Sequence, residues 1–430
     1  MYEIVSIIIS AVLFIAIMVI FTTERIDYIS FTILSAVIAC VIAGFVFGVG
    51  FTEFITYVEF EPLFFIICMQ VIIAITEEHQ IFRWLILKTL HWTKADHRKF
   101  FFLICFIASL TSAIVSDITV GIIFVPLVIR ACKILKINSA PYLFGLSFTI
   151  NIGSIYTPFS SSENILIANA FSLDFSYFII NFSLIVIPTL IYTLLLIDFI
   201  MLRKQEPPPE DYKKILLDVM DPNIIIVNKK KFVFNAIFFV GVIIGFIIFS
   251  EAYLVAIVGA VIMCLLNREK FADILQKVDL KVITFFIGIF LLMSTMEING
   301  TFIIIGDFIK GFISDNTLIA AITVLLMISV LSGFLAQIPT ALVFITLMQN
   351  IYGIGQVPNL IIMAILLGIN IGSNFLPQGA ACDLITLNLA EKNGVSDFNY
   401  KSLLKNGSMM TLLHIGVSIV YLALYSIIFP

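Results

Sequence analysis

The chain has 430 residues, of which 61% are hydrophobic and only 12% are charged, and its mean hydropathy is +1.14. Ordinary soluble domains are about 45–50% apolar and about 25% charged, so this composition excludes such a domain and predicts an integral membrane protein with roughly ten spans. The formal net charge of −4 is small, and six cysteines without a CxxC spacing predict neither a disulfide framework nor a zinc site.

The first half of the chain, residues 1–204, is expected to place apolar spans around one re-entrant hairpin and one broken helix. Residues 100–130 are apolar with a polar middle and basic residues behind them, which is typical of a hairpin that enters and leaves on one side. Residues 141–171 lie in an apolar region yet are rich in Asn, Gly, Ser and Thr, which indicates a broken helix. The other elements expected here are spans at 4–21, 28–49, 62–75 and 175–201 and an interfacial amphipathic helix at 81–92.

The second half of the chain is expected to repeat this plan. Residues 205–231 contain consecutive prolines and several lysines, and they predict a cytoplasmic linker. Residues 232–430 then form the second repeat, with a hairpin at 318–349 and a broken helix at 360–389. The remaining elements expected here are spans at 232–249, 253–266, 282–296 and 409–428 and a short apolar segment at 302–313.

One sequence motif occurs in both broken helices. Residues 151–169 read NIGSIYTPFSSSENILIAN, and residues 370–388 read NIGSNFLPQGAACDLITLN. Both copies keep the Asn-x-Gly-Ser start and a following proline, and Glu163-Asn164 of the first copy aligns with Cys382-Asp383 of the second. Paired interrupted helices in the two halves of an apolar chain are the strongest sequence indication of a transporter's binding site.

The distribution of basic residues indicates how the chain is threaded. If both hairpins re-enter, each half has about five crossings, so the second half starts on the opposite side and the repeats are inverted. With both termini outside, every Lys and Arg of the 24 except Lys310 falls in a cytoplasmic segment, as the positive-inside rule requires. The expected fold is therefore an all-α protein of two inverted-topology repeats, spanning the cell membrane several times.

Four polar tips, one from each hairpin and one from each broken helix, are expected to converge on an ion site. Half-helix N-termini favour anions through their free N–H groups, whereas unwound carbonyls and the side chains of Asn, Ser and Thr suit Na⁺ or a proton relay. The residues predicted to bind substrate or ion are Ser116, Asp117, Thr119, Asn151, Gly153, Ser154, Thr157, Ser160, Ser161, Glu163, Asn164, Gln337, Thr340, Asn370, Gly372, Ser373, Gly379 and Asp383. Among them, the candidates for holding Na⁺ are Asp117, Asn151, Asn370 and Asp383.

Three of these residues are ionisable, namely Asp117, Glu163 and Asp383, and the predicted site contains no Lys or Arg. An ionisable group at membrane depth is a functional hypothesis by default. Asp117 is expected to carry the exchangeable proton or to bind the coupling cation, because desolvation disfavours an unpaired charge. Glu163 either faces the site or points to an aqueous vestibule. Isolated serines such as Ser112 and Ser332 are expected to serve helix packing instead.

At these motifs the chain resembles the ion transporter superfamily, which includes arsenite permeases, pink-eyed-dilution-type proteins, a class of Na⁺/H⁺ antiporters, and citrate and dicarboxylate transporters. Ser116-Asp117-Ile118-Thr119 is similar to the family's Asp-Asn-x-Thr or Ser-Asn-x hairpin tip. Residues 151–164 are similar to its Asn-x-Gly-Gly-x-x-Thr-x-x-Gly-Asp-x-x-Asn motif. The resemblance covers nearly the whole chain and implies an elevator-type carrier, usually a homodimer, with a scaffold and a moving transport domain.

The chain also departs from the family pattern within these motifs. Asp117 stands where Asn is usual, and Ala336-Gln337 stands where Asp-Asn or Asn-Asn is common. Ser154 and Ser160 replace glycines, and Ser161 replaces the usual Asp. These replacements concern the substrate more than the fold.

The expected function is secondary active transport of a small ion coupled to H⁺ or Na⁺, of the arsenite or anion-permease type, with no cofactor beyond the coupling ion. Na⁺/H⁺ exchange is a close alternative, and di- or tricarboxylate transport is third because the predicted site offers no cation to pair with several carboxylates. A channel is a remote alternative, as is an intramembrane aspartyl peptidase built on Asp117 and Asp383, whose Gly-x-Gly-Asp motif the chain lacks. The expected partners are the ion, the lipid bilayer and a second copy of the chain, with no nucleic acid, and the protein is not expected to be an enzyme.

Overall fold

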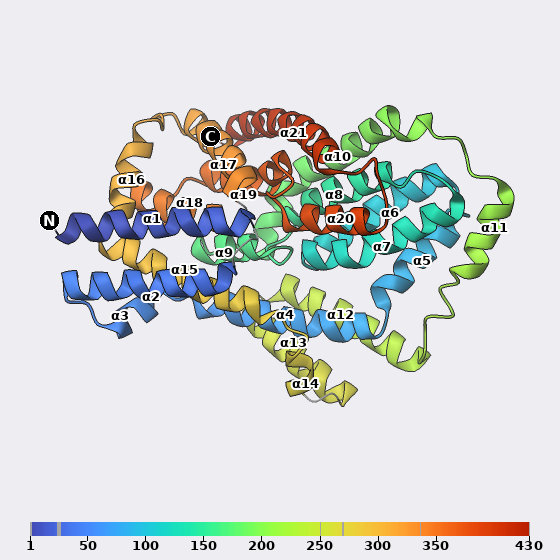
Figure 1. The fold of residues 1–430 in the computed structure, drawn as a ribbon, viewed down its shortest axis with the longest axis horizontal. Coiled ribbons are helices and arrows are strands. Elements are labelled where there is room, and N and C mark those ends of the chain that lie inside the picture. The colour runs from blue at the N-terminus through green and yellow to red at the C-terminus, as the bar shows by residue number, and fades with distance from the viewer. Residues whose placement is uncertain (1, 24–26, 250, 269–270, 336, 430) are drawn as a thin grey trace.

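The computed structural model describes residues 2–23, 27–249, 251–268, 271–335 and 337–429, and all regular elements in these ranges are helices. Figure 1 shows most of these helices running along the long axis of the molecule. Within the described ranges, nine helices are long and apolar enough to cross a membrane. This architecture is that of a multi-pass integral membrane protein, as the composition predicted.

The helices of the first half lie close to the ranges that the sequence predicted, except for a short helix at Phe51–Thr56 that it did not predict. In chain order they are α1 (Tyr2–Thr23), α2 (Tyr28–Phe47), α3 (Phe51–Thr56), α4 (Phe60–Glu78), α5 (Ile81–Trp92), α6 (His97–Ser112), α7 (Asp117–Leu135), α8 (Ala140–Ser154), α9 (Ser162–Ala170) and α10 (Phe175–Ile200). The first hairpin is therefore the pair α6 and α7, and the first broken helix is the pair α8 and α9.

The linker contains a helix that the sequence did not predict. A short 3-10 turn at Leu202–Lys204 is followed by α11 (Glu210–Val219). Pro209 precedes this helix and two acidic residues occupy its first turn, both of which favour a helix start. Leu216 is fully buried and α11 packs against α7, so the linker is anchored to the first half of the chain.

The second half contains the corresponding helices. They are α12 (Lys229–Ile248), α13 (Ala252–Asn267), α14 (Phe271–Leu275), α15 (Leu280–Ile298), α16 (Thr301–Lys310), α17 (Thr317–Leu335), α18 (Gln337–Tyr352), α19 (Asn359–Gly372), a 3-10 turn at Ser373–Phe375, α20 (Ala381–Lys392) and α21 (Tyr400–Ile428). The second hairpin is the pair α17 and α18, although Ala336, at its tip, lies outside the described residues. The last helix begins at Tyr400, earlier than the predicted span at 409–428.

Both broken helices are interrupted at the predicted place. In the first copy the chain leaves α8 after Ser154, passes Pro158 and resumes as α9, where the Ser161 side chain caps the new helix by accepting a hydrogen bond from the Asn164 amide. In the second copy the chain leaves α19 after Gly372 and resumes as α20. The interruption places a polar, non-helical segment in the middle of each apolar element.

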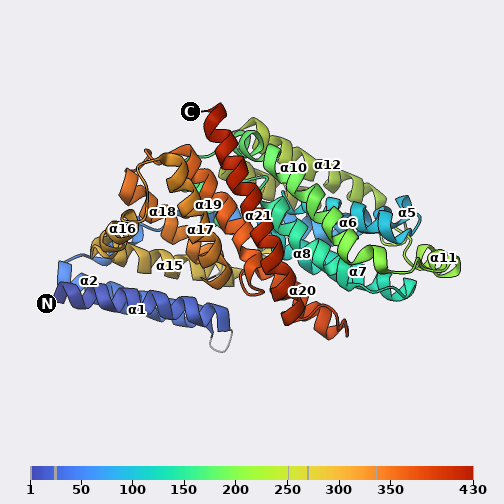
Figure 2. The same ribbon diagram turned by 90° about the horizontal axis from the view of Figure 1, so that it is seen from above.

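The packing pattern of one half recurs in the other. Helix α6 packs on α8, as α17 packs on α19, and α20 packs on α7, as α9 packs on α18. The reciprocal contacts α2 with α15 and α13 with α4 join the two halves further out. Figure 1 shows α20 lying beside α7 and α8, and Figure 2 shows α21 crossing over the helices of both halves.

The two broken helices form the centre of the molecule. Every residue of α8 is buried, and every residue of α19 after Asn359 is buried. Helices α1 and α12 instead expose rows of large apolar side chains, such as Ile8 and Ile15 on α1 and Ile237 and Val240 on α12. The duplicated motif is therefore enclosed by protein, and the apolar faces of the outer helices are available to lipid.

Candidate functional site

Equivalent hydrogen bonds attach each hairpin to its broken helix. The buried Ser112 hydroxyl donates to the Ile150 carbonyl over 2.9 Å, and the buried Ser332 hydroxyl donates to the Ile369 carbonyl over 2.9 Å. In both cases the accepting carbonyl belongs to the residue immediately before the first asparagine of the motif. The two serines therefore have the structural role that the sequence predicted for them.

The glycines of the motif are sites of close helix packing. A Cβ atom on Gly153 would lie 2.2 Å from the Ser109 carbonyl oxygen, and one on Gly372 would lie 2.4 Å from the Ser329 Cα atom. Only glycine permits so close an approach of α8 to α6 and of α19 to α17. The sequence assigned these glycines to the ion site, whereas their surroundings explain them by packing. The same holds for Gly379, where a Cβ would lie 2.2 Å from a backbone oxygen.

Hydrogen bonds cross from one broken helix to the other. The Asn151 Nδ2 atom donates to Asn374 Oδ1 over 2.7 Å and lies 3.4 Å from Asp383 Oδ1. The Asn370 Nδ2 atom donates to Asn164 Oδ1 over 2.9 Å. Each motif asparagine thus reaches the restarted helix of the other copy, since Asn164 and Asp383 occupy equivalent positions. The structure therefore brings the two motifs into direct contact.

Two further side chains complete these crossing contacts. The Ser154 hydroxyl lies 3.3 Å from Asn370 Oδ1, and the Ser147 hydroxyl donates to the Asp383 carboxylate. Sequence reasoning missed Ser147 and Asn374. The signal for Ser147 was its position one helical turn before Asn151, and the signal for Asn374 was its place directly after the Asn-x-Gly-Ser motif.

Several other predicted residues hold the first loop together. The Asn164 Nδ2 atom donates to the Ser154 carbonyl over 2.7 Å, and the Ser160 hydroxyl donates to the same carbonyl and to that of Thr157. The Thr157 hydroxyl donates to the Ala113 carbonyl at the hairpin tip. Because an unwound segment exposes carbonyls that water cannot reach here, these side chains satisfy the loop itself.

The three predicted carboxylates all lie in the first turn of a helix at this centre. Asp117 begins α7, Glu163 lies in α9 and Asp383 lies in α20, and their exposed fractions are 6%, 3% and 1%. The burial of Glu163 excludes the aqueous vestibule that the sequence left open for it. Acidic groups at helix N-termini neutralise the partial positive charge found there.

This placement changes the expected electrostatics of the site. The sequence suggested that half-helix N-termini would attract an anion, but the protein's own carboxylates occupy three of the four. Among the described residues, no Lys or Arg is buried. The remaining N-terminus, that of α18, carries the buried Gln337 in its first turn. The centre of the molecule is therefore rich in acidic groups and, among the described residues, holds no basic Lys or Arg side chain to pair with them.

Some oxygen atoms at this centre have no protein partner. Neither Glu163 Oε1 nor Asp383 Oδ2 has a hydrogen-bond partner among the described residues, and the same is true of Asn151 Oδ1. Buried polar atoms are normally satisfied, so these three acceptors, like the unpartnered Asn374 Nδ2 donor beside them, leave free hydrogen-bonding capacity at the centre.

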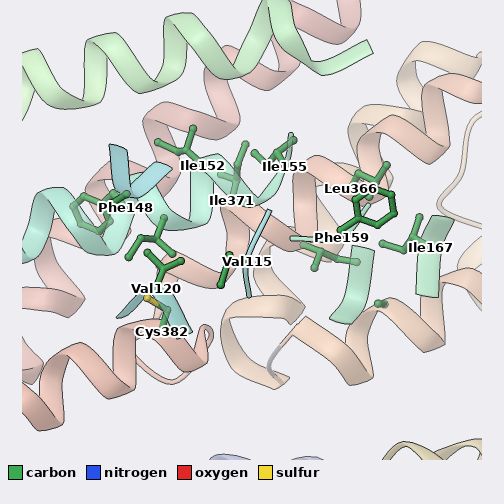
Figure 3. Close-up of a cluster of buried hydrophobic side chains, with 14 of the residues drawn as sticks. Val115, Val120, Phe148, Ile152, Ile155, Phe159, Ile167, Leu366, Ile371 and Cys382 are labelled. Atoms are coloured by element: carbon green, nitrogen blue, oxygen red, sulfur yellow. The ribbon is translucent and has the colours of Figure 1, made fainter. Parts of the chain in front are cut away.

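The other predicted residues make none of the contacts described above that cross between the two motifs, although the Ser116 hydroxyl lies 3.3 Å from Asp117 Oδ1. Ser116 and Thr119 are partly exposed at the start of the first hairpin's second helix, while Thr340 is buried in α18. The Ser373 hydroxyl donates to the Asn370 carbonyl over 2.9 Å, within its own turn. Figure 3 shows apolar side chains around this region, among them Val115 of the hairpin tip, Ile152 of α8 and Ile371 of α19. This apolar surrounding keeps the polar contacts in a low-dielectric environment.

Comparison with known proteins gives consistent matches. A family model described as "Citrate transporter" matches residues 1–368. The chain belongs to the citrate transporter family. It is 21% identical over 379 residues to an uncharacterized transporter of Mycobacterium tuberculosis, covering 86% of this chain and 88% of that protein. It is also 21% identical over 459 residues to the P protein of Mus musculus, covering 88% of this chain and 55% of that protein.

A third match is shorter. Over 91 residues the chain is 34% identical to the putative transporter arsB of Dictyostelium discoideum, which covers 21% of this chain and 16% of that protein. Together these matches confirm the predicted resemblance to the ion transporter superfamily. Membership of the citrate transporter family makes the chain a membrane transporter and not an enzyme, so the peptidase interpretation is excluded.

Proposed function

We propose that this citrate transporter family member is a secondary active transporter that moves a small ion and couples the movement to H⁺ or Na⁺. The observation that carries the proposal is the set of three buried carboxylates, Asp117, Glu163 and Asp383, in a centre without buried Lys or Arg among the described residues. A buried carboxylate is costly unless a proton or a cation neutralises it. Binding of H⁺ or Na⁺ at these groups supplies that neutralisation.

The same charge balance constrains the substrate. Citrate, the substrate in the family's name, carries several negative charges and would meet carboxylates at three helix N-termini. We therefore expect an anionic substrate to bind only together with the coupling cations, which bind first. The N-terminus of α18, where the uncharged Gln337 stands, is the position best suited to receive the anion.

Na⁺/H⁺ exchange is the second candidate function. The excess of buried carboxylates over basic side chains favours it, because a cation can itself be the cargo of such a site. Exchange of this kind requires no anion in the assay, and this requirement separates the two candidates.

Transport by the purified protein in proteoliposomes tests the proposal. We expect saturable uptake of labelled citrate, succinate or arsenite that is driven by an imposed proton or Na⁺ gradient and shows counterflow. A gradient-driven pH change with Na⁺ alone would favour exchange, and flux without counterflow would indicate a channel. A thermal-stability screen against the same ions identifies the ligand, because a ligand of the folded state stabilises it by mass action.

We further propose that the two halves are inverted repeats and that the hairpins and broken helices move as one unit, as in an elevator. The recurring contacts of α6 with α8 and of α17 with α19 support this view, as do the bonds that cross between the motifs. The outer helices α1, α2, α12 and α13 would then form the scaffold of a homodimer. Cysteines at Asp211 and Asn393 should label only from the cytoplasm and one at Asp315 only from outside. Labelling of Asp211 and Asp315 from the same side would contradict the inverted repeat.

A further inference from the structure

A cavity of about 460 Å³ lies where three short connections meet. These connections precede α4, join α9 to α10, and join α12 to α13. Its charged lining residues are Glu61, Asp174 and Glu251, all of which are exposed. The topology derived from the basic residues places all three connections on the outer side of the membrane, so the cavity is an outer vestibule.

Three aromatic rings line this vestibule side by side. Phe159 contributes to the cavity lining together with Phe65 of α4 and Phe246 of α12. The ring centroid of Phe159 lies 5.2 Å from that of Phe65, in a stacked arrangement, and 4.2 Å from that of Phe246. The Phe65 and Phe246 rings are themselves 5.7 Å apart, so the three rings form one compact group.

The chain position of Phe159 connects this aromatic group to the buried centre. Phe159 lies in the loop between α8 and α9, immediately before Ser160 and Ser161, which are 0% and 3% exposed. The cap at Ser161 begins the helix turn that carries Glu163. The loop therefore faces the vestibule on one side, through Phe159, and the buried polar contacts on the other.

We propose that Phe159 is the outer gate of the transport path, with Phe65 and Phe246 as the surface on which its ring seats. In the structure the three rings are in contact, which is the closed state of the proposed gate. Phe65 and Phe246 belong to apolar helices outside the broken helices, so movement of the loop relative to α4 and α12 separates the rings and opens the path. Stacked and tilted aromatic contacts of this kind are specific but individually modest, which suits a contact that must break in each cycle.

The proposal rests on the proposed function, since a gate implies a transported ion, but its test does not require transport. Single cysteines placed at Ser161 and, separately, at Val115 of the hairpin tip probe the inner side of the gate. A cysteine at Asn169, which lines the vestibule and is exposed, probes its outer side. The probe reagent is a cationic, membrane-impermeant methanethiosulfonate, applied from the side at which the Asn169→Cys variant reacts. The six native cysteines are all buried, and a variant without any added cysteine gives their background.

We expect Phe159→Ala to raise the labelling rate of both inner cysteines at least tenfold and to leave that of Asn169→Cys unchanged. Phe159→Tyr, which keeps the ring, should leave all three rates unchanged. Phe144→Ala is the matched control for general loosening, because Phe144 is buried in α8 and contacts Phe148 and Phe398 instead of the vestibule rings.

Two results would overturn the gate. One is that Phe159→Ala leaves the labelling rates of both inner cysteines unchanged while Asn169→Cys reacts. The other is an equal increase with Phe144→Ala. If the labelling result is as expected but no ion is transported, the gate stands and the proposed function fails, so the two failures are distinguishable.

Discussion

The two broken helices share one backbone plan and differ in charge at two adjacent positions, because Glu163 stands opposite Cys382 and Asn164 stands opposite Asp383. In the first copy Asn164 accepts a hydrogen bond from Asn370, whose own Oδ1 lies 3.3 Å from the Ser154 hydroxyl. In the second copy the equivalent position is Asp383, which lies 3.4 Å from the Asn151 amide. There, Asp383 Oδ2 and Asn151 Oδ1 have no partner among the described residues.

This difference separates the scaffold of the site from its chemistry. The first crossing contact is an amide network that satisfies itself and needs no ligand. The second joins the equivalent positions, but it contains a carboxyl group and leaves two acceptors without a partner among the described residues, and in our proposal these bind a proton or a cation. The two crossing contacts can thus differ in role although their backbones are alike, and Glu163 of the first copy adds a further unpartnered carboxylate oxygen beside them.

The largest expected loss of stability is at the glycines that the two copies share. Gly153→Ala and Gly372→Ala should each lower the free energy of unfolding by up to about 3 kcal/mol. The added Cβ would meet backbone atoms of the neighbouring helix, and at Gly153 also side-chain atoms, at less than 3.0 Å. Thermal unfolding in detergent measures this effect. Gly416→Ala in α21 is the control, since a Cβ there would meet nothing within 4 Å. A neutral effect at one motif glycine and a large one at the other would show that the two helix pairs are not packed alike.

A smaller and equal effect is expected at the two hairpin serines. Ser112→Ala and Ser332→Ala each remove one interhelical hydrogen bond, which in membrane proteins contributes about 0.6 kcal/mol on average and up to about 1.7 kcal/mol. Ser183→Ala is the control, because its hydroxyl bonds only a carbonyl of its own helix. Unequal losses, again measured by thermal unfolding, would weaken the equivalence of the two hairpins.

The smallest change is expected at Ser147, whose hydroxyl has no counterpart in the second copy. Ser147 donates to Asp383, and the position equivalent to Ser147 in the second copy is Leu366. Ser147→Ala removes a donor that stabilises the charged carboxylate, so we expect the apparent affinity for the coupling cation to change by a few-fold, with little loss of stability. Titration of cation-dependent counterflow measures this change. An unchanged cation affinity would indicate that Ser147 serves only packing.

Much of this architecture is predictable from the sequence. Apolar runs locate the spans, and a polar segment inside an apolar region locates each interruption, because unwound backbone at membrane depth requires polar partners. The repeated motif also identifies which residues of the two halves are equivalent. The helix α11 was not predicted, although its sequence is amphipathic, because it is short and lies in a polar segment that the consecutive prolines marked as a linker.

The roles of individual polar residues were less predictable. A motif shows that Gly153, Thr157 and Asn164 are special, but not whether they contact a ligand, a neighbouring helix or their own loop. That distinction depends on distances between segments far apart in the chain, such as the contact of Asn151 with Asp383. Ser147 and Asn374 were missed for the same reason. The partner of each, Asp383 for Ser147 and Asn151 for Asn374, lies in the other half of the chain.

The central claim is that buried carboxylates bind the coupling cation, and the pH and Na⁺ dependence of counterflow tests it most directly. Asp117→Asn and Asp383→Asn keep the shape of each side chain and remove its charge, and the exposed Asp315→Asn serves as the control. We predict that both buried variants remain folded but lose the pH or Na⁺ dependence of transport, with gradient-driven uptake reduced at least tenfold, which corresponds to about 1.4 kcal/mol. Unchanged pH and Na⁺ profiles in both variants would contradict the account.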